Sequence, residues 1–171
     1  SSNIFYISCS HNLGIDLFVE FLNQFEEYNN SDEEENFSIG LFGKTNVGKS
    51  TLFNKLVGFD RSLVSKNPKT TTDIVNSFFK FNGIKYLIKD TAGLIKKNKI
   101  DTDSLDYYAT KKTISIIKDI DINLFLIDVT QGFDNQSKKI LNIIYNKSNI
   151  LIILINKIDL IKGNKKKVLL E

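Results

Sequence analysis

Short apolar runs alternate with amphipathic stretches along most of the chain. Apolar, β-branched and aromatic runs predict strands at residues 4–8, 37–42, 74–81, 85–89, 122–128 and 149–155. Apolar residues three or four positions apart predict helices at residues 14–27, 48–57, 104–118 and 136–146. Near-continuous apolar strands that alternate with helices indicate a mostly parallel sheet covered on both faces. Asn82-Gly83, between two predicted strands, adds one antiparallel hairpin.

Composition narrows the class of protein without indicating a partner. The chain has 171 residues, of which 42% are apolar and 25% are charged, so it can bury a core. The formal net charge of +3 is too small to predict nucleic-acid or membrane binding by itself. A single cysteine, Cys9, excludes an intramolecular disulfide and favours a reducing compartment. The apolar run 150–155 is too short to span a bilayer, so we expect no membrane contact.

A contiguous phosphate-loop motif follows the strand predicted at residues 37–42. Residues 43–50, GKTNVGKS, fit G-x-x-x-x-G-K-[ST] and open a predicted helix, which is the context this motif requires. Gly43 and Gly48 let the backbone wrap closely around phosphate oxygens, and the helix N-terminus adds partial positive charge. Lys49 can neutralise the β- and γ-phosphates, and Ser50 can ligate Mg²⁺. A three-layer αβα P-loop NTPase fold is therefore predicted.

The tetrad Asn156-Lys157-Ile158-Asp159 follows the last predicted strand. Ligands of doubly wound sheets bind at the carboxyl ends of the strands, so this tetrad lies on the binding edge. The Asp159 carboxylate can accept hydrogen bonds from the ring N–H and the exocyclic amine of guanine, whereas adenine has no such donor pair. Asn156 and the stem of Lys157 can brace the base. The tetrad therefore predicts guanine over adenine.

Two further segments have the spacing of GTPase switches. Asp90-Thr91-Ala92-Gly93 follows a predicted strand, so Asp90 can hold the Mg²⁺ shell and the Gly93 N–H can meet a γ-phosphate. A threonine hydroxyl within residues 69–73, KTTTD, could reach Mg²⁺ only while the γ-phosphate is present.

Together these motifs resemble the second GTPase domain of the EngA (Der) family of bacterial tandem-GTPase ribosome-assembly factors. The resemblance runs through residues 38–160, and includes GKTNVGKSTLFNKL, RSLVSKNPKTTTD, DTAGLIKKNKID, DINLFLIDVTQGFDNQSKKI and NKIDL. The segment 7–17, ISCSHNLGIDL, is similar to the Ser-Ala-x-His-x-x-Gly-Ile segment that closes the first GTPase domain of that family. Residues 69–73 depart from the family's Gly-Thr-Thr-Arg-Asp.

The resemblance implies a role for individual residues. It makes Thr71 the switch threonine and a Mg²⁺ ligand with Ser50 and Asp90, and it makes Asn46 the ligand of a K⁺ ion. The catalytic groups that the resemblance implies are Lys49, Thr71, Gly93 and Asn46. Leu94 stands where other GTPases position water with Gln, which implies slow intrinsic turnover. The residues expected to contact the nucleotide are Gly43, Asn46, Val47, Gly48, Lys49, Ser50, Thr51, Asp90, Gly93, Asn156, Lys157 and Asp159.

The same resemblance divides the chain into three parts. Residues 1–28 are expected to be the C-terminal strand and helix of a first GTPase domain, residues 29–37 an acidic linker, and residues 38–171 a C-terminally truncated second domain. The second sheet would then lack an edge strand. A linker of roughly ten residues spans at most about 35 Å, so the strand and helix predicted at residues 4–27 can reach that open edge. We hypothesise that they complete the fold there as a circular permutation, with Ser8 and Cys9 against guanine.

Three functions remain open. The first is an enzyme that hydrolyses GTP to GDP and phosphate, with Mg²⁺ and K⁺, and the resemblance implies a role in assembly of the large ribosomal subunit. The second is a nucleotide-gated binding module with negligible hydrolysis, which the altered segment around Lys69 and Thr72 favours. The third is an inactive chain with an open base site. The expected partners are guanine nucleotide and ribosomal RNA or the large subunit, for a cytoplasmic or organelle-stroma monomer.

The remaining polar residues have less specific interpretations. His11 is the only histidine and has no evident nucleophile beside it, so we expect a loop role. We interpret Cys9 as a small residue in a tight loop. We expect two groups of lysines either to be solvated or to contact RNA phosphates. These are Lys96, Lys97 and Lys99, and the lysines within residues 162–167.

Overall fold

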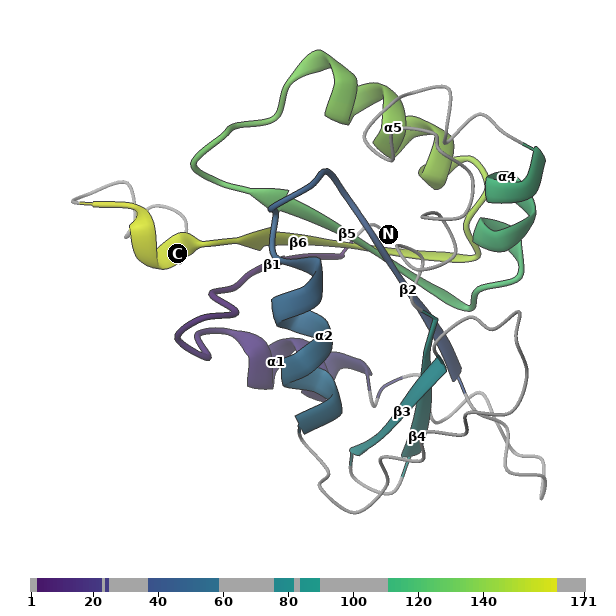
Figure 1. The fold of residues 1–171 in the computed structure, drawn as a ribbon, viewed down its shortest axis with the longest axis horizontal. Helices are drawn as coiled ribbons and strands as arrows, with labels where there is room; N and C mark the ends of the chain where they lie inside the picture. Colours follow the sequence, from purple (N-terminus) through teal and green to yellow (C-terminus); the bar gives the residue numbers. More distant parts are fainter. Residues whose placement is uncertain are drawn as a thin grey trace.

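The fold is a single sheet with helices on both faces, seen in a computed structural model that describes residues 3–22, 24, 37–58, 76–81, 84–89 and 111–162 (Figure 1). The strands are β1 (Asn3–Tyr6), β2 (Phe37–Phe42), β3 (Asn76–Phe81), β4 (Ile84–Lys89), β5 (Ile122–Asp128) and β6 (Ile150–Asn156). The helices are α1 (Ile15–Leu22), α2 (Lys49–Gly58), α4 (Lys111–Lys118), α5 (Asn135–Tyr145) and the short 3₁₀ helix η3 (Ile158–Leu160).

The described strands pair in the order β1-β6-β5-β2-β4-β3. All neighbouring pairs are parallel except β3 with β4, which are antiparallel. The carboxyl ends of β2, β5 and β6 therefore lie on one edge, and each is followed by a loop that can contribute to a site. This topology confirms the α/β fold with a mostly parallel sheet and one antiparallel hairpin.

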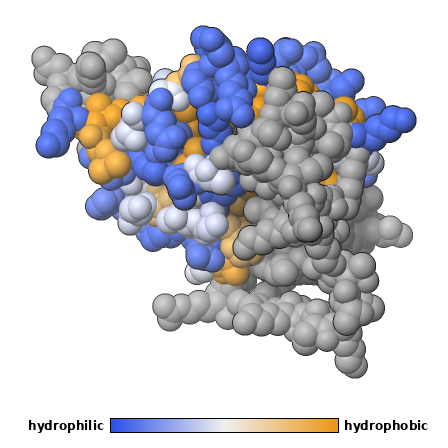
Figure 2. All heavy atoms as spheres, turned by 45° about the horizontal axis from the view of Figure 1, so that its top comes forward, coloured by the Kyte–Doolittle hydropathy of each residue, from blue (hydrophilic) through white to orange (hydrophobic). Residues whose placement is uncertain are grey.

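Two hydrophobic cores lie on opposite faces of the sheet. On one face α1 and α2 pack over β2, β5 and β6, with Phe18, Leu52 and Leu124 among the buried side chains. On the other face α4 and α5 pack over Phe125 and Leu151. Figure 1 shows these helix pairs on the two sides of the sheet. On the face shown in Figure 2, hydrophilic side chains predominate among the described residues, and the hydrophobic ones lie in small groups between them.

The N-terminal strand and helix belong to the same sheet and the same core. β1 runs parallel to β6, with Asn3 opposite Ile152 and Tyr6 opposite Ile155. Helix α1 buries a complete apolar stripe, formed by Ile15, Phe18, Val19 and Leu22. Burying one such side chain contributes about 1.5–3 kcal/mol. The hypothesis is confirmed in one part: the N-terminal strand lies at the edge of the sheet beside β6, and α1 covers one face of it.

Most predicted boundaries agree with the structure to within two residues. The strands at 37–42 and 122–128 are reproduced, and the helix predicted at 136–146 is α5 at Asn135–Tyr145. The helix predicted at 14–27 is Ile15–Leu22, and the one predicted at 104–118 is described only as Lys111–Lys118. Residues 29–36 of the predicted linker and the Asn82-Gly83 turn lie outside the described residues, and Phe37, the last residue of that linker, begins β2. Within the described part of the chain, no helix is long and apolar enough to cross a membrane.

Candidate nucleotide-binding site

The loop between β2 and α2 has a backbone that requires glycine at both ends. Gly43 has φ +132° and Gly48 has φ +109°, and Asn46 between them has φ +61°. A Cβ atom added to Gly43 would lie 2.5 Å from the carbonyl oxygen of Leu126 in β5. The loop is therefore pressed against the carboxyl end of β5, and side chains at these two positions would both strain and displace it.

Lys49, the first residue of α2, folds back over this loop. Its Nζ donates hydrogen bonds to the carbonyl oxygens of Gly43, at 2.6 Å, and of Lys44. The ammonium group is thereby fixed beside the positive end of the α2 dipole. Two sources of positive charge converge at this position, which suits a phosphate group.

A cavity of about 350 Å³ opens between the loop, β6 and the N-terminal segment. Its walls contain residues from all three segments, namely Cys9, Ser10, Asn46, Gly48, Lys49, Ser50, Thr51, Asn156 and Lys157. The phosphate-loop residues and the first two residues of the guanine tetrad, predicted separately from sequence, therefore share one cavity. Cys9 and Ser10 supply its third wall.

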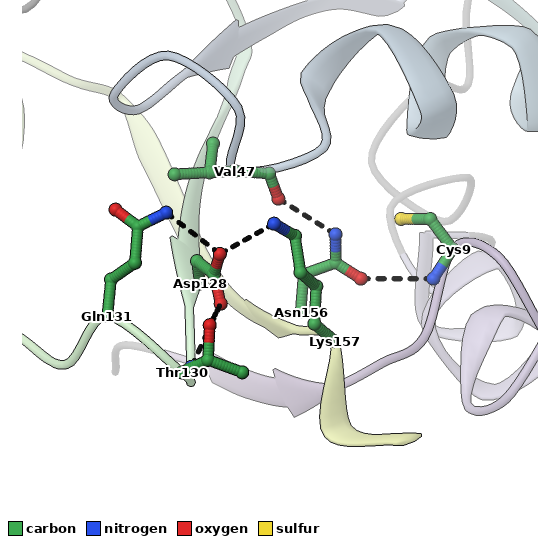
Figure 3. A network of polar contacts seen from close by, with 7 residues as sticks. All are labelled: Cys9, Val47, Asp128, Thr130, Gln131, Asn156 and Lys157. Atoms are coloured by element: carbon green, nitrogen blue, oxygen red, sulfur yellow. Dashed lines mark hydrogen bonds and ion pairs between the residues drawn. The ribbon is translucent and has the colours of Figure 1, made fainter. Parts of the chain in front are cut away.

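Asn156, at the end of β6, joins these walls to one another (Figure 3). Its Nδ2 donates to the carbonyl oxygen of Val47 at 2.8 Å, and its Oδ1 accepts from the Cys9 N–H at 3.0 Å. The side chain is buried, so both hydrogen bonds are shielded from water. A Cβ atom on Gly48 would lie only 2.2 Å from the same Nδ2. Asn156 thus sets the distance between the phosphate loop and the N-terminal segment.

Lys157 reaches in another direction, to Asp128 at the end of β5 (Figure 3). Its Nζ lies 2.6 Å from Asp128 Oδ2, and its backbone is left-handed, with φ +67°. Asp128 is only 2% exposed and also accepts from the Thr130 N–H and hydroxyl and from Gln131 Nε2. Burial raises the pKa of Asp128, but the hydrogen bonds from Lys157 and Thr130 outweigh it and leave the pKa below its usual value. The Lys157 stem is therefore held in place against the cavity.

Asp159, the predicted guanine acceptor, lies in η3 just beyond Lys157. Its Oδ2 is 3.4 Å from His11 Nδ1, and its side chain is 15% exposed. The carboxylate that we expect to read the base therefore faces the N-terminal loop.

Cys9 acts through its backbone N–H and its small size. The side chain is 1% exposed, and burial raises the pKa of its thiol to about 11, even though the charge of Lys55 lowers it. The thiol is therefore protonated at neutral pH and is a poor nucleophile. This agrees with the prediction of a small residue in a tight loop.

Several predicted residues lie outside the described part of the chain, among them Thr71, Asp90, Gly93, Leu94, Lys96, Lys97 and Lys99. The predicted Mg²⁺ ligands are therefore represented only by Ser50, which lines the cavity. Among the described residues, no cluster of three or more His, Cys, Asp or Glu side chains could hold a metal ion. The Mg²⁺ and K⁺ assignments stay predictions.

The network around Asp128 is the part of the site that sequence reasoning missed. Thr130 and Gln131, two and three residues after Asp128, donate hydrogen bonds to its carboxylate, which in turn accepts from Lys157. The available signal was a carboxylate at the carboxyl end of a buried strand, the same signal that singled out Asp90. A second missed contact joins Lys44 to Asp134, the N-cap of α5, at 2.5 Å. Hydrogen bonds from Lys44 and Ser137 hold the pKa of Asp134 well below its usual range.

Comparison with known proteins agrees with this geometry. The family described as 50S ribosome-binding GTPase matches residues 38–157, from β2 through the phosphate loop to Lys157. GTPase Der of Kosmotoga olearia is 36% identical over 172 residues, which cover 96% of this chain and 39% of the relative. GTPase Der of Mycoplasma capricolum is 36% identical over 169 residues, which cover 98% of this chain and 39% of the relative. The chain thus spans about two fifths of the length of these relatives.

Solved structures show the same fold. Era in complex with MgGDPNP and nucleotides 1506–1542 of 16S ribosomal RNA superposes with a TM-score of 0.53 at 30% identity, covering 78% of this chain and 44% of that one. Translation elongation factor SelB of Methanococcus maripaludis, in complex with a GTP analogue, superposes with a TM-score of 0.52 at 24% identity. The match covers 78% of this chain and 25% of that one, and it supports the fold alone. The chain belongs to the family of 50S ribosome-binding GTPases, hydrolases that act on GTP, and within it is similar to GTPase Der.

Proposed function

We propose that this chain binds GTP and GDP in the cavity between the phosphate loop and β6, and that it hydrolyses GTP to GDP and phosphate. One observation carries the proposal: residues of the phosphate loop and of the guanine tetrad line the same cavity and are joined through Asn156. Lys49 would contact the β- and γ-phosphates, and Asp159 would accept both donors of the guanine edge. The fixed position of Lys49 supports a role in stabilising charge that develops on the γ-phosphoryl group during in-line attack by water.

Mg²⁺ and K⁺ are part of this proposal. Ser50 lines the cavity and carries a hydroxyl oxygen, a hard donor of the kind that Mg²⁺ accepts, and we assign Thr71 and Asp90 to the same ion from the family pattern. Asn46 lines the cavity beside Lys49 and is the proposed K⁺ ligand. When bound, the two ions would neutralise negative charge on the phosphates. Gly93 would donate its N–H to the γ-phosphate.

We further propose that the nucleotide state acts in assembly of the large ribosomal subunit. The family description and the relatives named GTPase Der support this, and Era, which was solved with ribosomal RNA, supports an RNA or ribosome partner. The protein would then work where ribosomes assemble, in a bacterial cytoplasm or an organelle stroma. We expect it to do so as a monomer.

The nucleotide-gated binding module is the second candidate. Lys69 and Thr72 replace residues of the family's switch motif, and this favours a chain that binds nucleotide but turns it over negligibly. The third candidate, an inactive chain, required an open base site. Cys9 and Ser10 wall that side of the cavity, which argues against it.

Phosphate release separates the two remaining candidates. The 171-residue chain is incubated with excess GTP and Mg²⁺, in KCl or in NaCl, with Lys49→Ala as the matched control. We expect slow multiple-turnover release that is stimulated by KCl and abolished by EDTA and by the substitution. GTP binding without release above the Lys49→Ala background would favour the binding module.

A further inference from the structure

The loop that carries His11 is fixed to the strand that leads into the guanine tetrad. Ile7 donates its N–H to the Ile155 carbonyl oxygen at 2.8 Å, and the Ile158 N–H donates to the Ile7 carbonyl oxygen at 3.3 Å. The loop itself is closed by two backbone hydrogen bonds between Ser8 and Leu13, at 2.9 and 3.2 Å. His11 therefore stands at a defined position relative to η3.

Within this loop the His11 ring is directed at Asp159. Its Nδ1 lies 3.4 Å from Asp159 Oδ2 and 3.3 Å from Ser8 Oγ. The His11 backbone N–H also donates to Ser8 Oγ, at 3.3 Å. The His11 side chain is 63% exposed, whereas that of Asp159 is 15% exposed. Nδ1 is thus the ring atom that lies within contact distance of the carboxylate, while most of the His11 side chain stays exposed to solvent.

A carboxylate has about four acceptor positions, and the guanine edge offers two donors. A third donor can therefore contact Asp159 at the same time as the base. Such a contact restricts rotation of the carboxylate, and this matters most when two parallel hydrogen bonds must form at once. A base with one donor tolerates a mobile carboxylate better than a base with two.

We propose that His11 is a positioning residue for base selection: its Nδ1 donor holds the Asp159 carboxylate in the orientation that accepts both the ring N–H and the amine of guanine. The proposal deepens the proposed function and rests on it, because it presumes that Asp159 reads the base. His11 itself need not touch the nucleotide.

Three substitutions at one position test this. His11→Asn keeps a donor close to the place of Nδ1, His11→Gln moves the donor one bond further out, and His11→Leu removes it. The dissociation constants of GDP and of IDP, whose base lacks the exocyclic amine, are measured for each variant and for the unchanged chain, together with the melting temperature.

Because His11 is largely exposed, loss of its contact should change affinity by at most about fivefold. We expect His11→Leu to weaken GDP about three- to fivefold and IDP less than twofold, so the preference for GDP falls. His11→Gln should resemble His11→Leu, and His11→Asn should restore the preference, with melting temperatures unchanged.

The outcomes separate the two proposals. An unchanged chain that binds GDP and prefers it to IDP, with the same preference in His11→Leu, would overturn the role of His11 alone. Equal weakening of GDP and IDP, or failure of His11→Asn to restore the preference, would also overturn it in favour of a structural role. An unchanged chain that is folded but binds neither nucleotide would contradict the proposed function itself.

Discussion

The phosphate side and the base side of the cavity are built in different ways. On the phosphate side the lining that the structure describes comes from one contiguous segment, Asn46 and Gly48 of the loop and Lys49, Ser50 and Thr51 of the first turn of α2. On the base side the contacts join segments that are distant in sequence: the Cys9 N–H, beyond β1, donates to Asn156 at the end of β6, and the neighbouring Lys157 donates to Asp128 at the end of β5. The phosphate side depends on local backbone conformation, whereas the base side depends on the sheet having formed. Substitutions should therefore separate phosphate binding from base recognition.

The largest effect is expected from removing the anchor of the N-terminal segment. Phe18 is completely buried and packs edge-on against Phe5, with ring centroids 5.7 Å apart. Phe18→Ala should lower the free energy of unfolding by about 3–5 kcal/mol, because it leaves a cavity in the core shared with α2. Urea denaturation measures this.

The neighbouring Leu17 provides the matched control, since it is 68% exposed on the same helix. Leu17→Ala should change the free energy of unfolding by less than about 0.5 kcal/mol. Similar small changes in both variants would show that α1 is not part of the core.

The junction between the two sides is the next target. Gly48→Ala introduces a Cβ 2.2 Å from Asn156 Nδ2 at a backbone φ of +109°, so it should disturb the phosphate loop and the base wall together. We expect GDP affinity to fall by more than about 100-fold, which corresponds to a cost near 3 kcal/mol, the upper range for local backbone strain.

Gly58→Ala, at the other end of α2, has open space around its Cβ position and is the control. Isothermal titration of both variants with GDP checks the prediction. A Gly48→Ala chain that binds GDP like Gly58→Ala would mean that the loop and Asn156 are not in contact.

Lys49→Ala should affect the phosphate side alone. Hydrogen bonds to a charged group contribute about 1.5–3 kcal/mol, so GDP affinity should fall about 10- to 100-fold while guanosine affinity stays the same. The comparison of GDP with guanosine is made by competition against a fluorescent nucleotide. An equal loss for both ligands would show that the two sides are not separable.

Asp128→Asn should weaken the base side and give a stability that depends on pH. The pKa of Asp128 is lowered in the folded chain, so its network stabilises the fold above the unfolded value near 4 and loses that contribution as pH falls through the folded value. At pH 7 we expect a loss of about 1–3 kcal/mol in the free energy of unfolding, because the Lys157 ammonium, on a side chain that is 30% exposed, loses its charged partner.

The difference in the free energy of unfolding between the unchanged chain and Asp128→Asn should reach its maximum above about pH 5 and shrink below about pH 4. Denaturation curves at several pH values measure it, with Glu20→Gln, an exposed carboxylate on α1, as the control. A difference that does not change with pH would mean that Asp128 is not an ionised partner of Lys157.

The same contrast explains what the sequence could predict. The phosphate loop is contiguous, so its spacing alone predicts Gly43, Gly48, Lys49 and Ser50 as nucleotide-binding residues. The strands at 37–42 and 122–128 were found because both faces of each are buried and the apolar run is continuous. The local pattern also indicated β1 and α1, and the edge left open in the expected sheet suggested their position.

The contacts that cross the sheet were less accessible to sequence reasoning. Lys157 meets Asp128 across 28 intervening residues, and His11 meets Asp159 only because β1 lies beside β6. Neither pair has a spacing that marks it along the chain. Helix α1 is described only to Leu22, whereas the sequence predicts a helix to residue 27 with its last apolar position at Phe25.

The central claim is that the two sides form one pocket for a guanine nucleotide, with the N-terminal segment as a wall. The most direct measurement is binding of a fluorescent GDP analogue to the 171-residue chain in Mg²⁺ and K⁺, in competition with unlabelled GTP, GDP and ATP. We expect micromolar binding that GTP and GDP displace and ATP does not. A folded chain that fails to bind, or that ATP displaces as well as GTP does, would contradict the claim.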